Sequence, residues 1–109
     1  MKILTVCFGG NVRSVGCKYV LHAKYAHDAI ACGVDYNTQE TIDFLCEWAD
    51  YVIIMEPSFE HRINPKFKSK LFCYNVGEDV FGYAFHPQLL KMIDGMIQKH
   101  GLFCKKDKE

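Results

Sequence analysis

The sequence has no excess of charge of either sign, no long apolar run and no paired cysteine motif. Lys and Arg together number 13, as do Asp and Glu, so the formal net charge of the 109 residues is zero. This balance argues against a basic surface for nucleic acid and against an acidic disordered tail. The apolar run at the start of the chain is too short for a secretory signal or a membrane span. We therefore expect a cytoplasmic protein with neither a nucleic-acid nor a membrane partner.

The six cysteines are scattered along the chain and form no Cys-x-x-Cys pair. The five histidines add no zinc-ligand spacing, so we predict no metal site and no cofactor. Because nothing suggests a disulfide framework, we expect a reducing compartment. Cys32, Cys46 and Cys73 are then expected to be small buried apolar residues.

Four apolar runs alternate with four helix-like stretches, which is typical of a parallel sheet covered on both faces. We predict a single three-layer α/β domain over residues 1–104, with a four-stranded parallel sheet, and a charged tail over residues 105–109. No repeat, linker or low-complexity segment divides the chain. The predicted strands are 3–7, 28–32, 51–55 and 71–76, and the predicted helices are 14–25, one starting near 37, 58–63 and one starting at 87.

Local signals mark the ends of two predicted helices. Asn37 and Glu40, three residues apart, form a capping pair. Pro87 is at a favoured first helical position after His86, which we expect to cap the last helix, and Gly101 is a suitable terminator. Apolar residues recur at helical spacing in both helices, and this spacing predicts core contacts. These residues are Ile42, Leu45, Cys46 and Ala49 in one helix, and Leu89, Ile93, Met96 and Ile97 in the other.

The first apolar run ends at Cys7, and the glycine-bearing loop after it closes with Arg13 and Ser14. A loop of this length can turn its backbone N–H groups inward and form a concave anion site. A helix that begins at Ser14 adds its positive end, and the Arg13 guanidinium can donate two parallel hydrogen bonds to a phosphoryl group. The same positive field favours the thiolate form of Cys7. The predicted phosphate-binding residues are Phe8, Gly9, Gly10, Asn11, Val12 and Arg13.

Three stretches of the chain, taken in order, resemble the low-molecular-weight protein tyrosine phosphatases and more closely their compact branch. They are residues 6–14, which match the family's phosphate loop, residues 48–56, which are similar to its Ala-Asp-apolar-Met strand, and residues 78–81, which stand at its acid loop. The resemblance implies a metal-independent phosphomonoesterase that works through a phosphocysteine intermediate. Its implied substrate is a phosphotyrosine-containing protein or a small aryl phosphate.

The resemblance also implies a role for each matching residue. Cys7 would attack phosphorus, Arg13 would hold the phosphoryl oxygens, and Ser14 would donate a hydrogen bond to the thiolate. Asp79 would protonate the leaving phenolate and then take a proton from the hydrolytic water. Glu78, its neighbour in the chain, is the alternative acid.

Two features of the resemblance stay open at this level. Phe81 and Tyr83 would flank the mouth of the site and stack on an aryl phosphate, or they would form, together with Phe85, a hydrophobic flap over the core. The family usually has an asparagine where this chain has Gly10, and here Asn11 comes one residue later. We therefore expect the phosphate loop to be braced differently or less rigidly.

Other functions remain to be weighed against a phosphatase. An arsenate reductase shares the loop but needs further cysteines to relay a disulfide, and Cys73 and Cys104 are isolated. Sugar-transport B subunits, which are phosphocarriers, also have a cysteine above an anion loop but do not need Arg13. A non-catalytic phosphate or phosphopeptide binder would keep the loop without turnover. Cys17, in the helix after the loop, is a candidate for a protective disulfide with Cys7.

Overall fold

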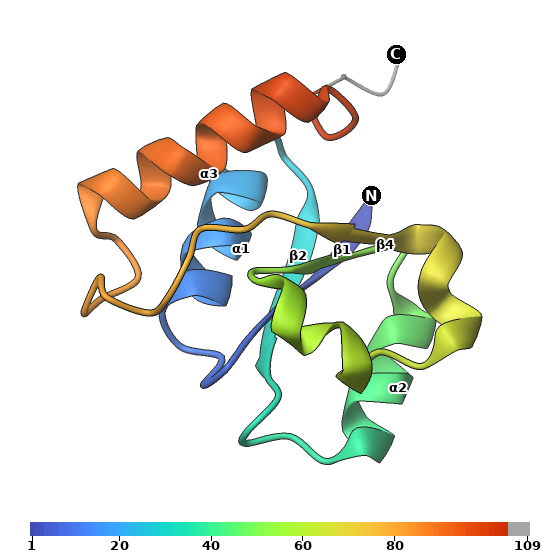
Figure 1. Ribbon diagram of the computed structural model, residues 1–109. Helices are drawn as coiled ribbons and strands as arrows, with labels where there is room; N and C mark the ends of the chain where they lie inside the picture. Colours follow the sequence, from blue (N-terminus) through green and yellow to red (C-terminus); the bar gives the residue numbers. More distant parts are fainter. Residues whose placement is uncertain (105–109) are drawn as a thin grey trace.

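The computed structural model describes residues 1–104, which form a four-stranded sheet between two layers of helices (Figure 1). All strand pairs are parallel, and the strands lie in the order β2-β1-β3-β4. The predicted three-layer α/β architecture is therefore confirmed, whereas the predicted tail at 105–109 lies outside the described residues. The elements are β1 (Lys2–Cys7), α1 (Arg13–Ala23), β2 (Asp28–Gly33), α2 (Gln39–Trp48), β3 (Tyr51–Ile54), the 3-10 helices η1 (Pro57–Arg62) and η2 (Pro65–Lys70), β4 (Leu71–Cys73) and α3 (Pro87–His100).

Strand β1 lies inside the sheet because its side chains are apolar on both faces. Ile3, Leu4 and Val6 are fully buried, as expected for a parallel strand covered by helices on both sides. The register pairs Cys7 of β1 with Gly33 at the end of β2, and Val6 with Ile54 at the end of β3. The carboxyl ends of these three strands therefore meet at one edge of the sheet, where ligands bind in open α/β folds.

The helices cover the two faces unequally. Helices α1 and α3 pack together on one face and α2 lies on the other (Figure 1). The core residues predicted for α3 are largely confirmed, since Leu89, Ile93 and Ile97 have no exposed surface. The predicted ends of α3 are confirmed as well: the His86 ring accepts a hydrogen bond from the Gln88 N–H (3.1 Å). Gly101 has the left-handed φ of 84° that favours glycine.

The predicted cap of α2 is wrong by one residue. Thr38, rather than Asn37, is the N-cap, and its hydroxyl oxygen accepts from the Thr41 N–H (3.2 Å). The Asn37 side chain is used elsewhere, since its Oδ1 accepts from the Gly33 N–H (2.9 Å). Asn and Thr are both favoured N-cap residues, and here the side chain of Asn37 is used in the tight turn after β2 instead.

The predicted fourth strand is too long, because β4 ends at Cys73. Its partner β3 ends at Ile54, so only isolated bonds continue the pairing, such as that from Tyr74 N–H to the Ile54 carbonyl (2.9 Å). Cys73 is exposed, contrary to the prediction, because β4 is an edge strand. The other predicted boundaries agree with the structure to within two residues, and η2 was not predicted.

Candidate active site

Cys7 lies at the floor of the candidate site, at the carboxyl end of β1. Its side chain is 1% exposed. The backbone N–H of Gly10 donates a hydrogen bond to Sγ (3.2 Å), and the Cys7 thiol donates to Ser14 Oγ (3.0 Å). Loop and helix therefore each place a polar group on the sulfur, which suits a sulfur that carries negative charge during a reaction.

Ser14 is fixed from below by β1. Thr5, a buried residue of that strand, donates from its hydroxyl to the Ser14 carbonyl oxygen (2.7 Å). Helix α1 begins next to this contact, where the Gly16 N–H donates to the Val12 carbonyl (2.8 Å). Sequence reasoning missed Thr5, although a polar residue inside an apolar strand was a signal for such a contact.

Arg13 is a buried cation, with 2% of its surface exposed. One terminal nitrogen, Nη1, donates both to Glu56 Oε1 (2.6 Å) and to the Gly77 carbonyl oxygen (2.8 Å). The guanidinium carbon also lies 5.5 Å from the centre of the Phe59 ring, within cation–π range. The buried Nε has no hydrogen-bond partner within residues 1–104. Arg13 is thus held rigidly and keeps a donor for another group.

Glu56 is the carboxylate that holds Arg13, and sequence reasoning assigned it no role. The hydrogen bond from Arg13, together with one from the Ser58 hydroxyl to Oε2 (2.6 Å), lowers the pKa of Glu56. Glu56 follows Met55 just after β3. A charged residue directly after a buried strand, at the edge where Cys7 lies, was the signal that could have identified it.

The phosphate loop packs directly on the end of β2, and this contact requires glycines. Gly10 has φ of +76°, and a Cβ there would lie 2.7 Å from the Gly33 backbone nitrogen. A Cβ on Gly33 would lie 2.4 Å from the Gly9 carbonyl carbon. No side chain fits between these backbones, so neither position 10 nor position 33 can carry a Cβ without displacing the other segment.

Backbone hydrogen bonds brace the loop instead. The Val34 N–H donates to the Cys7 carbonyl oxygen (2.9 Å), and the Asp35 N–H donates to the Phe8 carbonyl oxygen (2.9 Å). These bonds continue the β1–β2 pairing beyond the last strand residues. The loop is thus braced by the segment after β2.

Arg62 of η1 holds that bracing segment. Its Nη1 donates to the Val34 carbonyl (2.6 Å) and its Nε to Gln39 Oε1 (2.9 Å). Tyr36, in the middle of the segment, is 75% exposed and lies beside Gly9, where a Cβ would be 3.5 Å from its ring. Neither Arg62 nor Tyr36 was predicted. Tyr36 lies in a segment that joins a strand to a helix and gives no periodic signal, and Arg62 meets that segment from 28 residues away in the chain.

The segment with the predicted acid is attached to the site at both ends. At one end, the Gly77 carbonyl oxygen accepts the bond from Arg13. At the other end, the Ala84 carbonyl oxygen lies 2.8 Å from where a Cβ on Gly16 of α1 would be. Asp79 is two residues after Gly77 and is exposed. The structure therefore brings the start of the acid segment to Arg13.

The two predicted mouth aromatics have different surroundings. Phe81 is buried in the main core cluster, with 8% of its surface exposed, whereas Tyr83 is 54% exposed. Tyr83 is thus the one of the pair that is accessible to another molecule. Glu78, the alternative acid, is exposed like its neighbour Asp79.

The cysteines near Cys7 are free thiols, so the candidate Cys7–Cys17 disulfide is not formed. Burial, with a smaller effect from Cys7, raises the pKa of Cys17. Burial, followed by Cys46 and Cys7, raises the pKa of Cys32 to about 12. Both groups stay protonated near neutral pH and are therefore poor nucleophiles.

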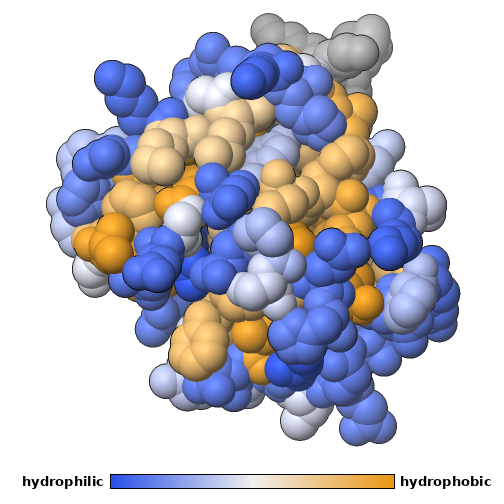
Figure 2. Space-filling view, in the orientation of Figure 1, coloured by the Kyte–Doolittle hydropathy of each residue, from blue (hydrophilic) through white to orange (hydrophobic). Residues whose placement is uncertain are grey.

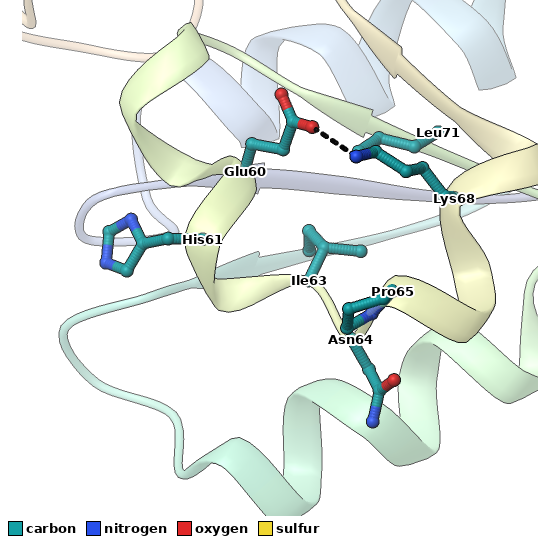
Figure 3. A pocket seen from close by; sticks show the side chains of 7 residues that line it. All are labelled: Glu60, His61, Ile63, Asn64, Pro65, Lys68 and Leu71. Atoms are coloured by element: carbon teal, nitrogen blue, oxygen red, sulfur yellow. Dashed lines mark ion pairs between the residues drawn. The ribbon is translucent and has the colours of Figure 1, made fainter.

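A separate hollow of about 380 Å³ lies between η1 and η2 (Figure 3). Its rim carries an exposed ion pair, Glu60 to Lys68 (3.5 Å), and its lining contains none of the candidate residues. Within residues 1–104, no group of three or more His, Cys, Asp or Glu side chains is arranged to hold a metal ion. Over the same residues no helix is long and apolar enough to cross a membrane.

No family model and no curated protein matches the chain. Solved structures do match. Tyrosine phosphatase AmsI of Erwinia amylovora aligns with a TM-score of 0.68 and 18% identity, over 90% of this chain and 89% of that chain. Vibrio vulnificus Wzb, in complex with benzylphosphonate, aligns with a TM-score of 0.70 and 16% identity, over 91% and 95% of the two chains.

A third similar structure is the YwlE arginine phosphatase of Geobacillus stearothermophilus, with a TM-score of 0.65 and 19% identity, over 92% of each chain. All three alignments span most of both molecules, and the sequence identities are low. The resemblance seen in the sequence is thus confirmed at the level of architecture. The chain has the fold of the low-molecular-weight tyrosine phosphatases.

Proposed function

We propose that this protein is a metal-independent phosphomonoesterase that hydrolyses phosphotyrosine through a phosphocysteine intermediate. One observation carries the proposal: the buried Arg13 guanidinium, with an Nε that lacks a partner within residues 1–104, stands at the end of the loop that surrounds Cys7. A buried donor without a partner costs about 1–3 kcal/mol, and a phosphoryl oxygen would satisfy it. Neighbours with the same fold include enzymes described as tyrosine phosphatases, which supports this choice.

Binding would use the loop and the helix together. The backbone N–H groups of Phe8 to Arg13 and the positive end of α1 would surround the phosphoryl oxygens. Arg13 would add charge-assisted hydrogen bonds to them. The carboxylate of Glu56 and the Gly77 carbonyl hold the guanidinium in place, so little reorganisation is needed when the ester binds.

In the first chemical step, the Cys7 thiolate would attack phosphorus. The S–P bond forms while the bond from phosphorus to the phenolic oxygen breaks, and the Asp79 carboxyl gives its proton to that oxygen. Once Cys7 is a thiolate, the Ser14 hydroxyl, 3.0 Å from the sulfur, donates to it and stabilises its charge. The product of this step is a free phenol and phosphocysteine.

In the second step, water would attack the phosphocysteine. The Asp79 carboxylate takes a proton from the water, the O–P bond forms, and the S–P bond breaks to release inorganic phosphate and the thiolate. Ser14 again stabilises the departing sulfur. A reducing, cytoplasmic setting suits this cycle, because the nucleophile must not be oxidised.

The decisive experiment is the hydrolysis of para-nitrophenyl phosphate between about pH 5 and 7 in the presence of a chelator. We expect Cys7→Ser to abolish turnover and Asp79→Asn to lower kcat by about 10²-fold or more. Glu78→Gln is the matched control, since it removes the neighbouring carboxylate, and it should change kcat little. Vanadate should inhibit the wild-type protein.

Two results would refute parts of this proposal. If the wild-type protein binds phosphate or vanadate but turns over no substrate, the chain is a phosphate-binding domain and not an enzyme. If Glu78→Gln is the slow variant while Asp79→Asn is active, the acid is Glu78.

A further inference from the structure

Large apolar side chains that are exposed to solvent gather around the candidate site. Seven such residues are exposed in the described part of the chain. One of them, Phe44, lies on α2, away from the segments that contact the phosphate loop or α1. The others lie in the loop itself, beside it, on α1 or in the acid segment. Figure 2 shows hydrophobic side chains over the segment between β4 and α3, at the left of the view. Exposed apolar groups that cluster in this way mark interaction sites.

Four of these residues are called here the docking patch: Tyr19 on α1, and Val80, Tyr83 and Phe85 on the acid segment. The rings of Tyr19 and Phe85 meet edge to face with centroids 4.9 Å apart. Tyr19 is nevertheless 46% exposed and Phe85 54% exposed. The two rings therefore hold each other in position while each keeps an open face.

The position of the docking patch follows from the attachments of the acid segment. Its first residue, Gly77, is bonded to Arg13, and Ala84, next to Phe85, contacts Gly16 of α1. Tyr19 is one turn further along α1. The docking patch therefore lies on two segments, α1, which begins at Arg13, and the acid segment, which contacts Arg13 at Gly77. A bound peptide, which adds about 3.3 Å per extended residue, would reach the patch within a few residues of the phosphotyrosine.

The charges near the patch favour a protein partner over a membrane. Three carboxylates stand near it, Glu78 and Asp79 on the acid segment and Asp94 on α3. They face three lysines, Lys18, Lys24 and Lys91, and Lys24, Lys91 and Asp94 line one hollow with Tyr19. Because these charges balance, the surface has no excess of positive charge, which is what an anionic membrane attracts. A protein segment needs no such positive charge, and aromatic side chains are the residues that most often anchor protein contacts.

We propose that the docking patch binds an apolar residue that flanks the phosphotyrosine of a protein substrate. The inference rests on the proposed function and names its substrate class: phosphoproteins in which the modified tyrosine lies beside a large aliphatic or aromatic residue. The phosphate loop would bind the phosphoryl group, and the faces of Tyr19 and Phe85 would bind the flanking side chain.

The test compares three substrates: para-nitrophenyl phosphate and two phosphotyrosine peptides that differ only in leucine or serine at the flanking positions. We expect the wild-type kcat/KM to favour the leucine peptide by about tenfold. Phe85→Ser should lower kcat/KM for the leucine peptide about fivefold to tenfold and change the other two substrates by less than about twofold. Tyr19→Ser should behave in the same way, and circular dichroism should show that both variants are folded.

Phe44→Ser is the matched control, because Phe44 is 72% exposed but lies on α2. It should leave all three substrates unchanged. Equal kcat/KM for the two peptides with the wild-type protein would overturn the inference, as would equal effects of Phe44→Ser and Phe85→Ser. A concentration-dependent dimer that is lost in Phe85→Ser, without any peptide preference, would assign the patch to a second copy of the chain and also overturn it.

Binding to the Cys7→Ser variant separates the two proposals. If the wild-type protein hydrolyses nothing, the proposed function fails. Tighter binding of the leucine peptide by Cys7→Ser, and its loss when Phe85→Ser is added, would still support the docking patch. Equal binding of both peptides would overturn the patch as well.

Discussion

At the scale of single residues, the site depends on one ion pair. Arg13 is buried, and the carboxylate of Glu56 is the only ionised partner it has within residues 1–104. Removing one member of such a pair leaves the other charge uncompensated, which is more harmful than removing both. Glu56 therefore stabilises the fold and also fixes the group that would bind phosphate.

This pair makes stability depend on pH. Since Arg13 and Ser58 lower the pKa of Glu56 below its ordinary value of 4.5 in the folded chain, the carboxylate stabilises the folded state above that pH. The contribution is lost as the pH falls below 4.5 and through the folded-state pKa. We expect Glu56→Gln to lower the Tm at pH 7, with a difference from wild type that shrinks below about pH 4.

The measurement is thermal unfolding of both proteins across that pH range. Glu60→Gln is a suitable control, because the Glu60–Lys68 pair is exposed and is expected to contribute little. If the Tm curves of Glu56→Gln and wild type run parallel at all pH values, Glu56 does not have the role assigned to it.

At the scale of elements, the contact between the phosphate loop and the end of β2 sets the shape of the site. Gly10 and Gly33 let two backbones approach closely, and hydrogen bonds from Val34 and Asp35 then hold the loop. Arg62 in turn holds the bracing segment. The loop geometry is thus imposed by its neighbours and not by its own side chains.

Gly10→Ala should therefore disrupt the site. The new Cβ would clash with Gly33 at a positive φ, and we expect a destabilisation of about 1–3 kcal/mol and weaker binding of phosphate. Gly95→Ala is the contrasting change, since Gly95 is an exposed residue of α3 with open space around its Cα. It should stabilise the chain by about 0.5–1 kcal/mol.

Chemical denaturation gives both free energies of unfolding, and calorimetric titration with inorganic phosphate gives the affinities. If Gly10→Ala is as stable as wild type and binds phosphate equally well, the close contact with β2 is not a constraint.

Sequence reasoning located the parts of the site that are local and missed those that are distant in the chain. Cys7, Arg13 and Ser14 lie within one strand–loop–helix unit, so their spacing predicted the unit. Glu56 and the Gly77 carbonyl meet Arg13 from 43 and 64 residues away, and only the strand order β1-β3-β4 brings them there. Phe81 is buried and Tyr83 is exposed on the two sides of Gly82, which has φ of +81°, and a loop without periodicity does not reveal this difference.

At the scale of the whole molecule, the same packed layer, formed by α1 and α3, belongs to both the hydrophobic core and the candidate site. Ile93 of α3 has no exposed surface, and its Cδ1 lies 3.5 Å from where a Cβ on Gly16 of α1 would be. Helix α3 therefore supports the first turns of α1, which begins at Arg13. The packing of α3 against α1 therefore helps to hold Arg13, and with it the guanidinium, in place.

We expect Ile93→Ala to destabilise the chain by about 2–5 kcal/mol, because it removes a fully buried side chain and leaves a cavity. Ile93→Val, which deletes a single methylene group, should cost about 0.5–1.5 kcal/mol. Denaturant unfolding of the two variants checks both values. A loss below about 1 kcal/mol for Ile93→Ala would mean that the helix layer relaxes around the cavity.

The two hydrogen bonds donated by Arg13 Nη1 also link anion binding at the proposed site to the stability of the folded chain. The nitrogen joins three parts of the chain that are far apart in sequence, so the proposed anion site would exist only in the native ensemble and would be lost on unfolding. An anion that binds only this ensemble shifts the unfolding equilibrium by mass action, in proportion to the logarithm of its concentration. Inorganic phosphate, the product of the proposed reaction, would thereby act as a pharmacological chaperone for its own enzyme and slow proteolysis wherever it accumulates.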